Sequence, residues 1–169
     1  MFRKLNASEI DVRVQSVKEG KGAVLLLYKD ARCDMNILDE TVGALNWQRE
    51  HKLIGDVMYC GISIWDEAKE QWITKWDAGT ESNMEAAKGA SSDSFKRSAF
   101  NFGIGRELYT SPFIWINWAG FNKYDKFTVE KIAYDADGIS GLSIRNGEGK
   151  RVFVWQKKNG NDNKQEESS

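Results

Sequence analysis

The sequence predicts an α+β fold in which an antiparallel sheet packs on a long amphipathic helix, and three observations lead to this prediction. Short runs rich in β-branched and aromatic residues are separated by tight-turn signals, as in antiparallel hairpins. Two other stretches repeat their apolar residues every three or four positions, as amphipathic helices do. The chain has 169 residues, of which 41% are hydrophobic, so it is long enough to bury a core without disulfides or metals.

The first predicted elements are a β-hairpin and a helix. Between Asp11 and Tyr28, alternating valines are followed by the turn sequence Glu-Gly-Lys-Gly and by an apolar run, an order typical of a hairpin. Asp30 is a residue type that caps helices, and apolar side chains then recur on one face as far as Val42. Gly43 predicts the end of this helix.

The middle of the chain predicts three antiparallel strands and then the long helix. The strands, rich in β-branched and aromatic residues, are Trp47–Ile54, Val57–Trp65 and Gln71–Asp77. The helix is expected to begin at Ser82 or Asn83 and to end at Phe102. Phe95, Ala99 and Phe102 recur at spacings of four and three, so they predict the stripe that faces the sheet.

A further β region is predicted towards the C-terminus. Its strands, separated by tight-turn signals, are Phe127–Tyr134, Ile139–Arg145 and Arg151–Gln156. Residues 157–169 contain no apolar side chain to offset the entropy of ordering them, so we expect a disordered tail there. We therefore expect a single domain over residues 1–156.

Several classes of protein are disfavoured by the composition. No apolar run approaches the roughly 20 residues that span a bilayer, and the first residues lack the apolar segment of a signal peptide, so we expect a cytoplasmic protein without membrane contact. Cys33 and Cys60 are expected to be buried thiols, because two isolated cysteines in a reducing compartment behave as small hydrophobes.

Catalysis finds little support in the residues. The only histidine, His51, lies in a predicted strand among charged residues, and no nucleophile motif or phosphate loop accompanies it. We therefore expect His51 on the surface, no enzymatic activity, no metal and no other cofactor. Asp56, Asp66, Glu67 and Glu70 lie at strand ends and turns, where acids are commonly solvated. They leave a divalent-metal nuclease open as an alternative, and a structural oligomer that does not bind DNA is another.

One segment concentrates positive charge. Between Lys88 and Arg106 the cations outnumber the single acid Asp93 by three, in a chain whose net charge is only -1 and whose pI is about 5.9. Lys96 and Arg97 are adjacent on the predicted helix, so they point into sectors about 100° apart. This pair suits phosphate binding, although solvation or pairing with nearby acids is the alternative.

The same segment carries a resemblance to a known family. The sequence DSFKRSAFNFG at Asp93–Gly103 resembles the helix signature of the Rad52 family of DNA single-strand annealing proteins, with Asp, Lys-Arg, small residues and Phe-Gly in that order. The sequences GRELY and SPFIWI, between Gly105 and Ile116, resemble the version found in the Sak-type annealases of phages. The resemblance extends from Ala31 to Ile116.

This resemblance implies an ATP-independent protein, phage-encoded, that anneals complementary DNA strands in homologous recombination. It implies a curved antiparallel sheet on the long helix, and subunits assembled into rings or partial rings. Single-stranded DNA would lie in a positively charged groove around the ring. A single-strand-binding protein or an exonuclease would be its protein partner, in the cytoplasm of a bacterial host.

The resemblance also assigns roles to individual residues. Lys96 and Arg97 match the basic pair at the base of the groove, and Arg32 falls within one position of a further groove arginine. Lys69 and Lys88 are candidates for a second, outer strand site. Two residues depart from the family's pattern, because Phe100 replaces an arginine and Ala44 replaces an aromatic residue. These departures imply a groove that is less basic than in eukaryotic relatives.

Overall fold

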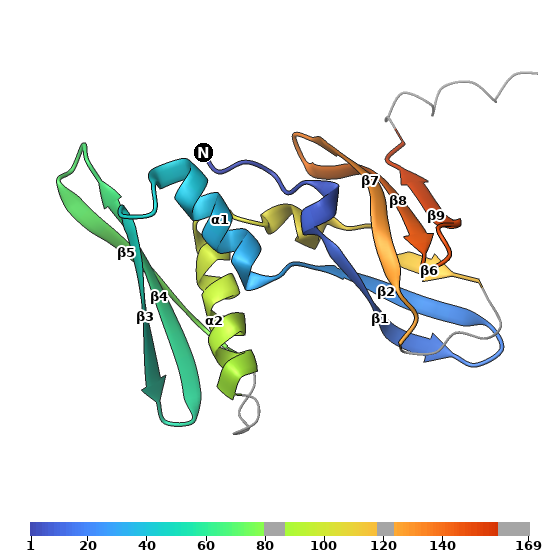
Figure 1. The fold of residues 1–169 in the computed structure, drawn as a ribbon, viewed down its shortest axis with the longest axis horizontal. Helices are drawn as coiled ribbons and strands as arrows, with labels where there is room; N and C mark the ends of the chain where they lie inside the picture. Colours follow the sequence, from blue (N-terminus) through green and yellow to red (C-terminus); the bar gives the residue numbers. More distant parts are fainter. Residues whose placement is uncertain (80–86, 118–123, 159–169) are drawn as a thin grey trace, which may run out of the picture. The chain divides into compact units, whose positions relative to one another are not determined.

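The computed structural model describes residues 1–79, 87–117 and 124–158. Within them, antiparallel strands and two α-helices confirm the predicted α+β class (Figure 1). The chain divides into two compact units, of which the first comprises residues 1–5 and 29–106 and the second residues 6–28 and 107–169. That residues 1–156 act as a single domain stays a prediction. The predicted tail lies outside the described residues from position 159 onward.

The first unit is built on a three-stranded antiparallel sheet. Its strands, in the spatial order β3-β4-β5, are β3 (Trp47–Ile54), β4 (Val57–Asp66) and β5 (Gln71–Ala78). These bounds agree with the predicted strands to within one residue. Cross-strand partners lie on the same face of a sheet, so Arg49, Ile62 and Lys75 share one face because Ile62 pairs with both of the others.

Helix α2 (Ala87–Asn101) packs on this face of the sheet. The predicted start at Ser82 or Asn83 lies outside the described residues. Phe95 and Ala99 are fully buried as expected, whereas Phe102, the predicted third member of the stripe, is only half-buried. Ser94 and Ser98, which are not part of the predicted apolar stripe, are also fully buried. Small side chains therefore allow α2 to approach the sheet closely.

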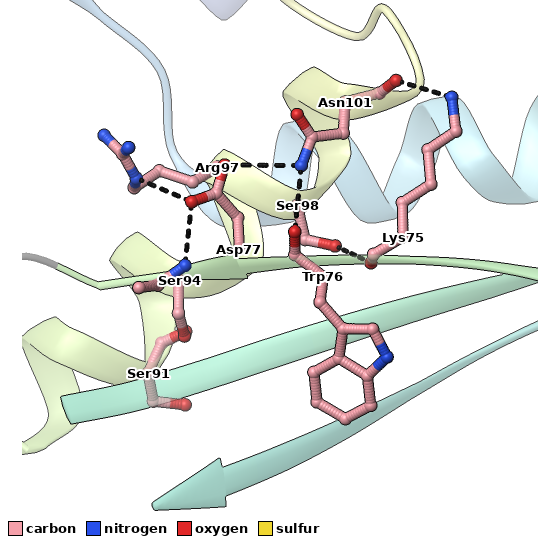
Figure 2. A network of polar contacts seen from close by, with 9 residues as sticks. Lys75, Trp76, Asp77, Ser91, Ser94, Arg97, Ser98 and Asn101 are labelled. Atoms are coloured by element: carbon pink, nitrogen blue, oxygen red, sulfur yellow. Dashed lines mark hydrogen bonds and ion pairs between the residues drawn. The ribbon is translucent and has the colours of Figure 1, made fainter. Parts of the chain in front are cut away.

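Ser98 ties the helix to two strands at once. Its hydroxyl donates a hydrogen bond to the main-chain oxygen of Lys75 on β5 (2.7 Å) and accepts one from the main-chain N–H of Ile62 on β4 (3.2 Å). Because its donor and acceptor are both used, the burial of this polar side chain carries little cost. Figure 2 shows Ser98 between the helix and β5.

The opposite face of the sheet carries three tryptophans beside polar residues such as Ser63 and Thr74, whose hydroxyls lie 2.7 Å apart. Trp65, Trp72 and Trp76 lie on it with 38%, 41% and 38% of their surface exposed. The Trp76 ring lies across Gly61, where a Cβ atom would come within 2.5 Å of the ring. The Lys52 ammonium lies 4.6 Å from the centre of the same ring, within cation–π distance.

Helix α1 (Ala31–Val42) begins and ends where the sequence predicts. The Asp30 carboxylate accepts a hydrogen bond from the main-chain N–H of Arg32, and Gly43 ends the helix with a φ of 86°. Just before the helix, Lys29 forms a buried ion pair with Asp34 in the first turn. Burial raises the pKa of Asp34 to about 6, although the positive charges of Lys29 and Lys96 act in the opposite direction.

The second unit contains a six-stranded antiparallel sheet. Its strands, in the spatial order β6-β2-β1-β7-β8-β9, are β1 (Asp11–Lys18), β2 (Gly22–Tyr28), β6 (Ile114–Ile116), β7 (Phe127–Asp135), β8 (Gly138–Asn146) and β9 (Arg151–Gln156). Strands β1 and β2 form the predicted hairpin. The sheet is strongly curved, since its two edge strands, β6 and β9, come into contact with each other.

Two short 3-10 helices complete the fold, η1 (Ala7–Glu9) and η3 (Arg106–Thr110). Cys33 and Cys60 are buried thiols, as predicted. Among the described residues, no helix is long and apolar enough to cross a membrane.

Candidate nucleic-acid interface

Lys96 lies on α2 beside the beginning of α1. It is half-buried and makes no hydrogen bond or ion pair with the residues that the structure describes. It is nevertheless close enough to α1 for its positive charge to act on two carboxylates, those of Asp30 and Asp34. The pKa of Asp30 is lowered, chiefly by hydrogen bonds from Arg32 and to a smaller degree by the charge of Lys96. Among the described residues, no acid is in direct contact with the Lys96 ammonium to neutralise its charge.

Arg97, the next residue, turns toward β5. Its Nε lies 3.4 Å from a carboxylate oxygen of Asp77, and 41% of the side chain is exposed. The other oxygen of Asp77 accepts a hydrogen bond from the Asn101 side chain at 3.3 Å, as Figure 2 shows. The outer guanidinium nitrogens of Arg97 have no hydrogen bond to the described residues, so they can still donate to a phosphate.

Arg32 lies in the first turn of α1, with 83% of its side chain exposed. Its guanidinium donates two hydrogen bonds to Asp30, at 3.0 and 3.1 Å. Arg32 and Lys96 therefore act on the same carboxylate, although they are far apart in the sequence. The structure thus brings three of the predicted site residues, Arg32, Lys96 and Arg97, to the packed pair of helices and the adjoining strand.

The other two predicted residues are placed differently. Lys69 lies in the turn between β4 and β5, with 62% of its side chain exposed, and pairs with Asp66 at 3.3 Å. It makes no described contact with Arg32, Lys96 or Arg97. The side chain of Lys88 lies outside the described residues, so its predicted role stays a prediction.

Two exposed cations at the end of α2 were not selected from the sequence. Lys75 of β5 and Arg106, which follows the helix, both donate hydrogen bonds to main-chain oxygens in the last turn of α2. The period-two alternation on β5 could have placed Lys75 on the face that carries α2. No comparable sequence pattern predicts the path of the chain after the helix, and this path determines the position of Arg106.

His51 and the turn acids do not form a catalytic or metal-binding group within the described residues. His51 is part-buried rather than on the surface, and its Nε2 lies 3.2 Å from the main-chain oxygen of Ser91 and 3.1 Å from the Ser91 hydroxyl. This contact joins β3 to α2. Asp66, one of the turn acids, pairs with Lys69. In the described part of the chain, no three His, Cys, Asp or Glu side chains are grouped so that they could hold a metal ion.

Comparison with known proteins points to one family. The family described as "Rad52/22 family double-strand break repair protein" matches residues 2–127, which include both helices and the three-stranded sheet. The single-stranded DNA-binding protein DdrA of Deinococcus radiodurans is 35% identical over 98 residues, which are 57% of this chain and 46% of that protein. The chain thus spans about half the length of this curated relative. No solved structure matches the chain.

Proposed function

Because this chain belongs to the Rad52/22 family of double-strand break repair proteins, we propose that it binds single-stranded DNA and anneals complementary strands during recombinational repair. The observation that carries this proposal is the position of Lys96 and Arg97 on α2. Lys96 makes no ion pair with the described residues, and Arg97 keeps its outer nitrogens available. The name of the DdrA relative, a single-stranded DNA-binding protein, agrees with it.

The work of such a protein is physical rather than covalent. Two complementary strands repel each other through their phosphates, and Lys or Arg contacts neutralise this charge while counterions are released. The bases of the bound strand stay exposed for pairing. Nothing in this process consumes ATP or needs a metal or other cofactor, so we propose that annealing is ATP-independent and that the protein is not an enzyme.

We propose a division of the predicted residues into two strand sites. Lys96, Arg97 and Arg32 would hold the first strand, because they lie on α2 and the adjoining start of α1. Lys88 and Lys69, which lies in the turn between β4 and β5, would contact the second strand. Lys69→Ala is then expected to leave binding of one strand mostly intact and to slow annealing.

Self-assembly is part of the proposal. The outer face of the three-stranded sheet, with Trp65, Trp72 and Trp76, can be covered by a neighbouring copy. So can the edges of β3 and β5, which pair with no further strand among the described residues. We propose a ring or partial ring of subunits with DNA along it. In a phage-infected bacterium it would act in the host cytoplasm, with a single-strand-binding protein or an exonuclease as partner.

Salt-dependent binding tests the first strand site. If Lys96 or Arg97 binds a phosphate, the slope of log affinity against log salt should fall in magnitude by about 0.7 for each phosphate interaction that a substitution removes. Fluorescence anisotropy with a short labelled oligonucleotide measures this slope for Lys96→Ala and Arg97→Ala. Lys21→Ala, which removes an exposed cation from the β1–β2 turn, is the matched control. A folded Lys96→Ala/Arg97→Ala variant with an unchanged slope contradicts the site.

Annealing of two complementary oligonucleotides, with and without ATP and magnesium, tests the activity itself. We expect annealing to proceed in the absence of both ATP and magnesium, and ATP should not change its rate. Magnesium-dependent cleavage that EDTA abolishes would instead indicate a nuclease. Absence of any DNA binding would indicate a structural oligomer.

A further inference from the structure

Two cations meet at one oxygen atom at the C-terminal end of α2. The Lys75 ammonium donates a hydrogen bond to the main-chain oxygen of Asn101 at 2.9 Å. Arg106 Nη2 donates to the same oxygen, also at 2.9 Å, and its Nε donates to the main-chain oxygen of Phe100 at 2.8 Å. Both positive groups therefore lie next to each other, although they come from a strand and from the segment after the helix.

Neither cation is neutralised by an acid within the described residues. Their hydrogen-bond acceptors are carbonyl oxygens, which carry only the partial negative charge of a helix C-terminus. Two like charges so close repel each other, and an anion placed between them relieves this repulsion. Arg97 differs in this respect, because Asp77 offsets part of its charge.

An aromatic ring supports each of the two cations. The Lys75 Nζ lies 4.8 Å from the centre of the Phe102 ring, and the Arg106 guanidinium carbon lies 5.4 Å from the centre of the Phe100 ring. Each positive group is thus fixed between a ring and a carbonyl oxygen, while the residue remains exposed. Long basic side chains that are fixed in advance lose less entropy when they bind.

We propose that Lys75 and Arg106 form a further phosphate-binding site for single-stranded DNA, continuous with Arg97. The link is Asn101, whose main-chain oxygen binds Lys75 and Arg106 while its side chain binds the Asp77 carboxylate that holds Arg97. A strand that contacts Arg97 would meet this cation pair at the end of the same helix. The inference rests on the proposed function, since it extends the path of the same DNA strand.

The alternative is that Lys75 and Arg106 only cap the helix, since cations stabilise a helix C-terminus. The salt slope separates the two roles, because a cap that does not touch DNA leaves it unchanged. Lys75→Gln and Arg106→Gln keep a hydrogen-bond donor and remove the charge. We expect each to reduce the magnitude of the slope for a short labelled oligo(dT) by about 0.7. Arg106→Lys, which keeps the charge, should retain the slope of the unchanged protein.

Lys21→Gln, an equal change of net charge in the β1–β2 turn, should also leave the slope unchanged. Circular dichroism establishes that each variant is folded. If the folded Lys75→Gln and Arg106→Gln variants keep the original slope while Lys96→Ala/Arg97→Ala has a shallower one, the cation pair caps the helix only and the proposed function stands. If the unchanged protein does not bind oligo(dT) at all, the proposed function itself fails.

Chemical protection of the unchanged protein provides a measurement that does not depend on the folding of variants. Acetylation of lysine amines, followed by mass spectrometry, reports which ammonium groups DNA covers. We expect oligo(dT) to slow the acetylation of Lys75 and to leave Lys21 unaffected. Equal acetylation of Lys75 with and without bound DNA would overturn the inference.

Discussion

The buried ion pair between Lys29 and Asp34 makes two residues depend on each other. The side chains are 8% and 0% exposed, so each charge has its partner in place of water. Gly105, in a backbone conformation with a φ of 74°, packs directly against the Lys29 side chain. A Cβ atom at this position would collide with Lys29, so the pair also fixes the segment that leaves α2.

Removing one member of the pair should cost more than removing both. Lys29→Met or Asp34→Asn leaves an uncompensated buried group, which typically lowers the free energy of unfolding by about 3–5 kcal/mol. Lys29→Met/Asp34→Leu removes both charges and should recover a large part of this loss. Urea unfolding measures all three variants. Additive losses in the double variant would show that the two charges are independent.

Asp77 is expected to weaken DNA binding by competing for Arg97. Its carboxylate holds Nε of the guanidinium and accepts a hydrogen bond from Asn101. Asp77→Asn keeps a polar side chain of similar size and removes the negative charge. We expect tighter binding of single-stranded DNA at low salt, with a steeper salt dependence.

An equal change of charge elsewhere is the control for this prediction. Asp56→Asn, in the exposed turn between β3 and β4, should leave the affinity almost unchanged. Anisotropy titrations of both variants make the comparison. Equal effects of the two substitutions would mean that DNA affinity depends only on net charge. The release of Arg97 from Asp77 would then have no specific effect on binding.

The elements that sequence predicts well are those with local signals. Asp30 and Gly43 define α1 through a side-chain cap and a positive φ, both of which depend on neighbouring residues alone. The contact between α2 and the sheet, in contrast, depends on residues that are distant in the sequence. Ser94 and Ser98 are as buried as Phe95, because hydrogen bonds to strands distant in sequence satisfy Ser98. No periodicity of apolar residues can reveal such partners.

Three strands of the second unit are joined by one charge cluster. Glu130 on β7, whose side chain is 7% exposed, pairs at 2.5 Å with Arg145 on β8 and with Arg151, the first residue of β9. Hydrogen bonds from Arg151 and Arg145 lower the pKa of Glu130 from its ordinary 4.5 to about 2. Because the folded pKa is the lower one, the carboxylate stabilises the fold at neutral pH and loses this effect in acid.

Glu130→Gln should therefore show a stability defect that depends on pH. The free energy of unfolding of the unchanged protein should exceed that of the variant above pH 4.5, and the difference should shrink as the pH falls toward 2. Urea unfolding at a series of pH values measures it. Glu148→Gln, in the exposed β8–β9 turn, is the control. A difference that stays constant with pH would contradict the ion-pair explanation.

At the scale of the whole molecule, sequence patterns predict the pairing of neighbouring strands but not the pairing of distant ones. The β1–β2 hairpin and the antiparallel strands β3, β4 and β5 are predicted, whereas the pairing of β2 with β6 and of β1 with β7 is not. These two pairings depend on contacts between residues far apart in the chain, such as Ala23 with Ile116. The division into two units is therefore invisible to local patterns.

The aromatic outer face of the first unit leads to a prediction about assembly. Trp65, Trp72 and Trp76 keep about two fifths of their surface in contact with solvent, and apolar patches of this kind mark interaction surfaces. Trp72→Glu places a charge at this face without touching the α2 side of the sheet. We expect the variant to fold and to lose self-association, because a neighbouring copy would have to bury the carboxylate without a partner.

Light scattering at micromolar concentration, with and without single-stranded DNA, measures the mass of the unchanged protein and of the variant. The unchanged chain should give a mass several times that of its 19.2 kDa monomer. Val154→Glu, at an exposed position on β9 of the other sheet, is the control and should assemble normally. Normal assembly of Trp72→Glu would place the subunit contact elsewhere, and a clean monomer for the unchanged protein under both conditions would refute assembly. Annealing then provides the functional consequence, because a monomer presents each phosphate contact only once along a strand, whereas an assembly repeats it with every subunit.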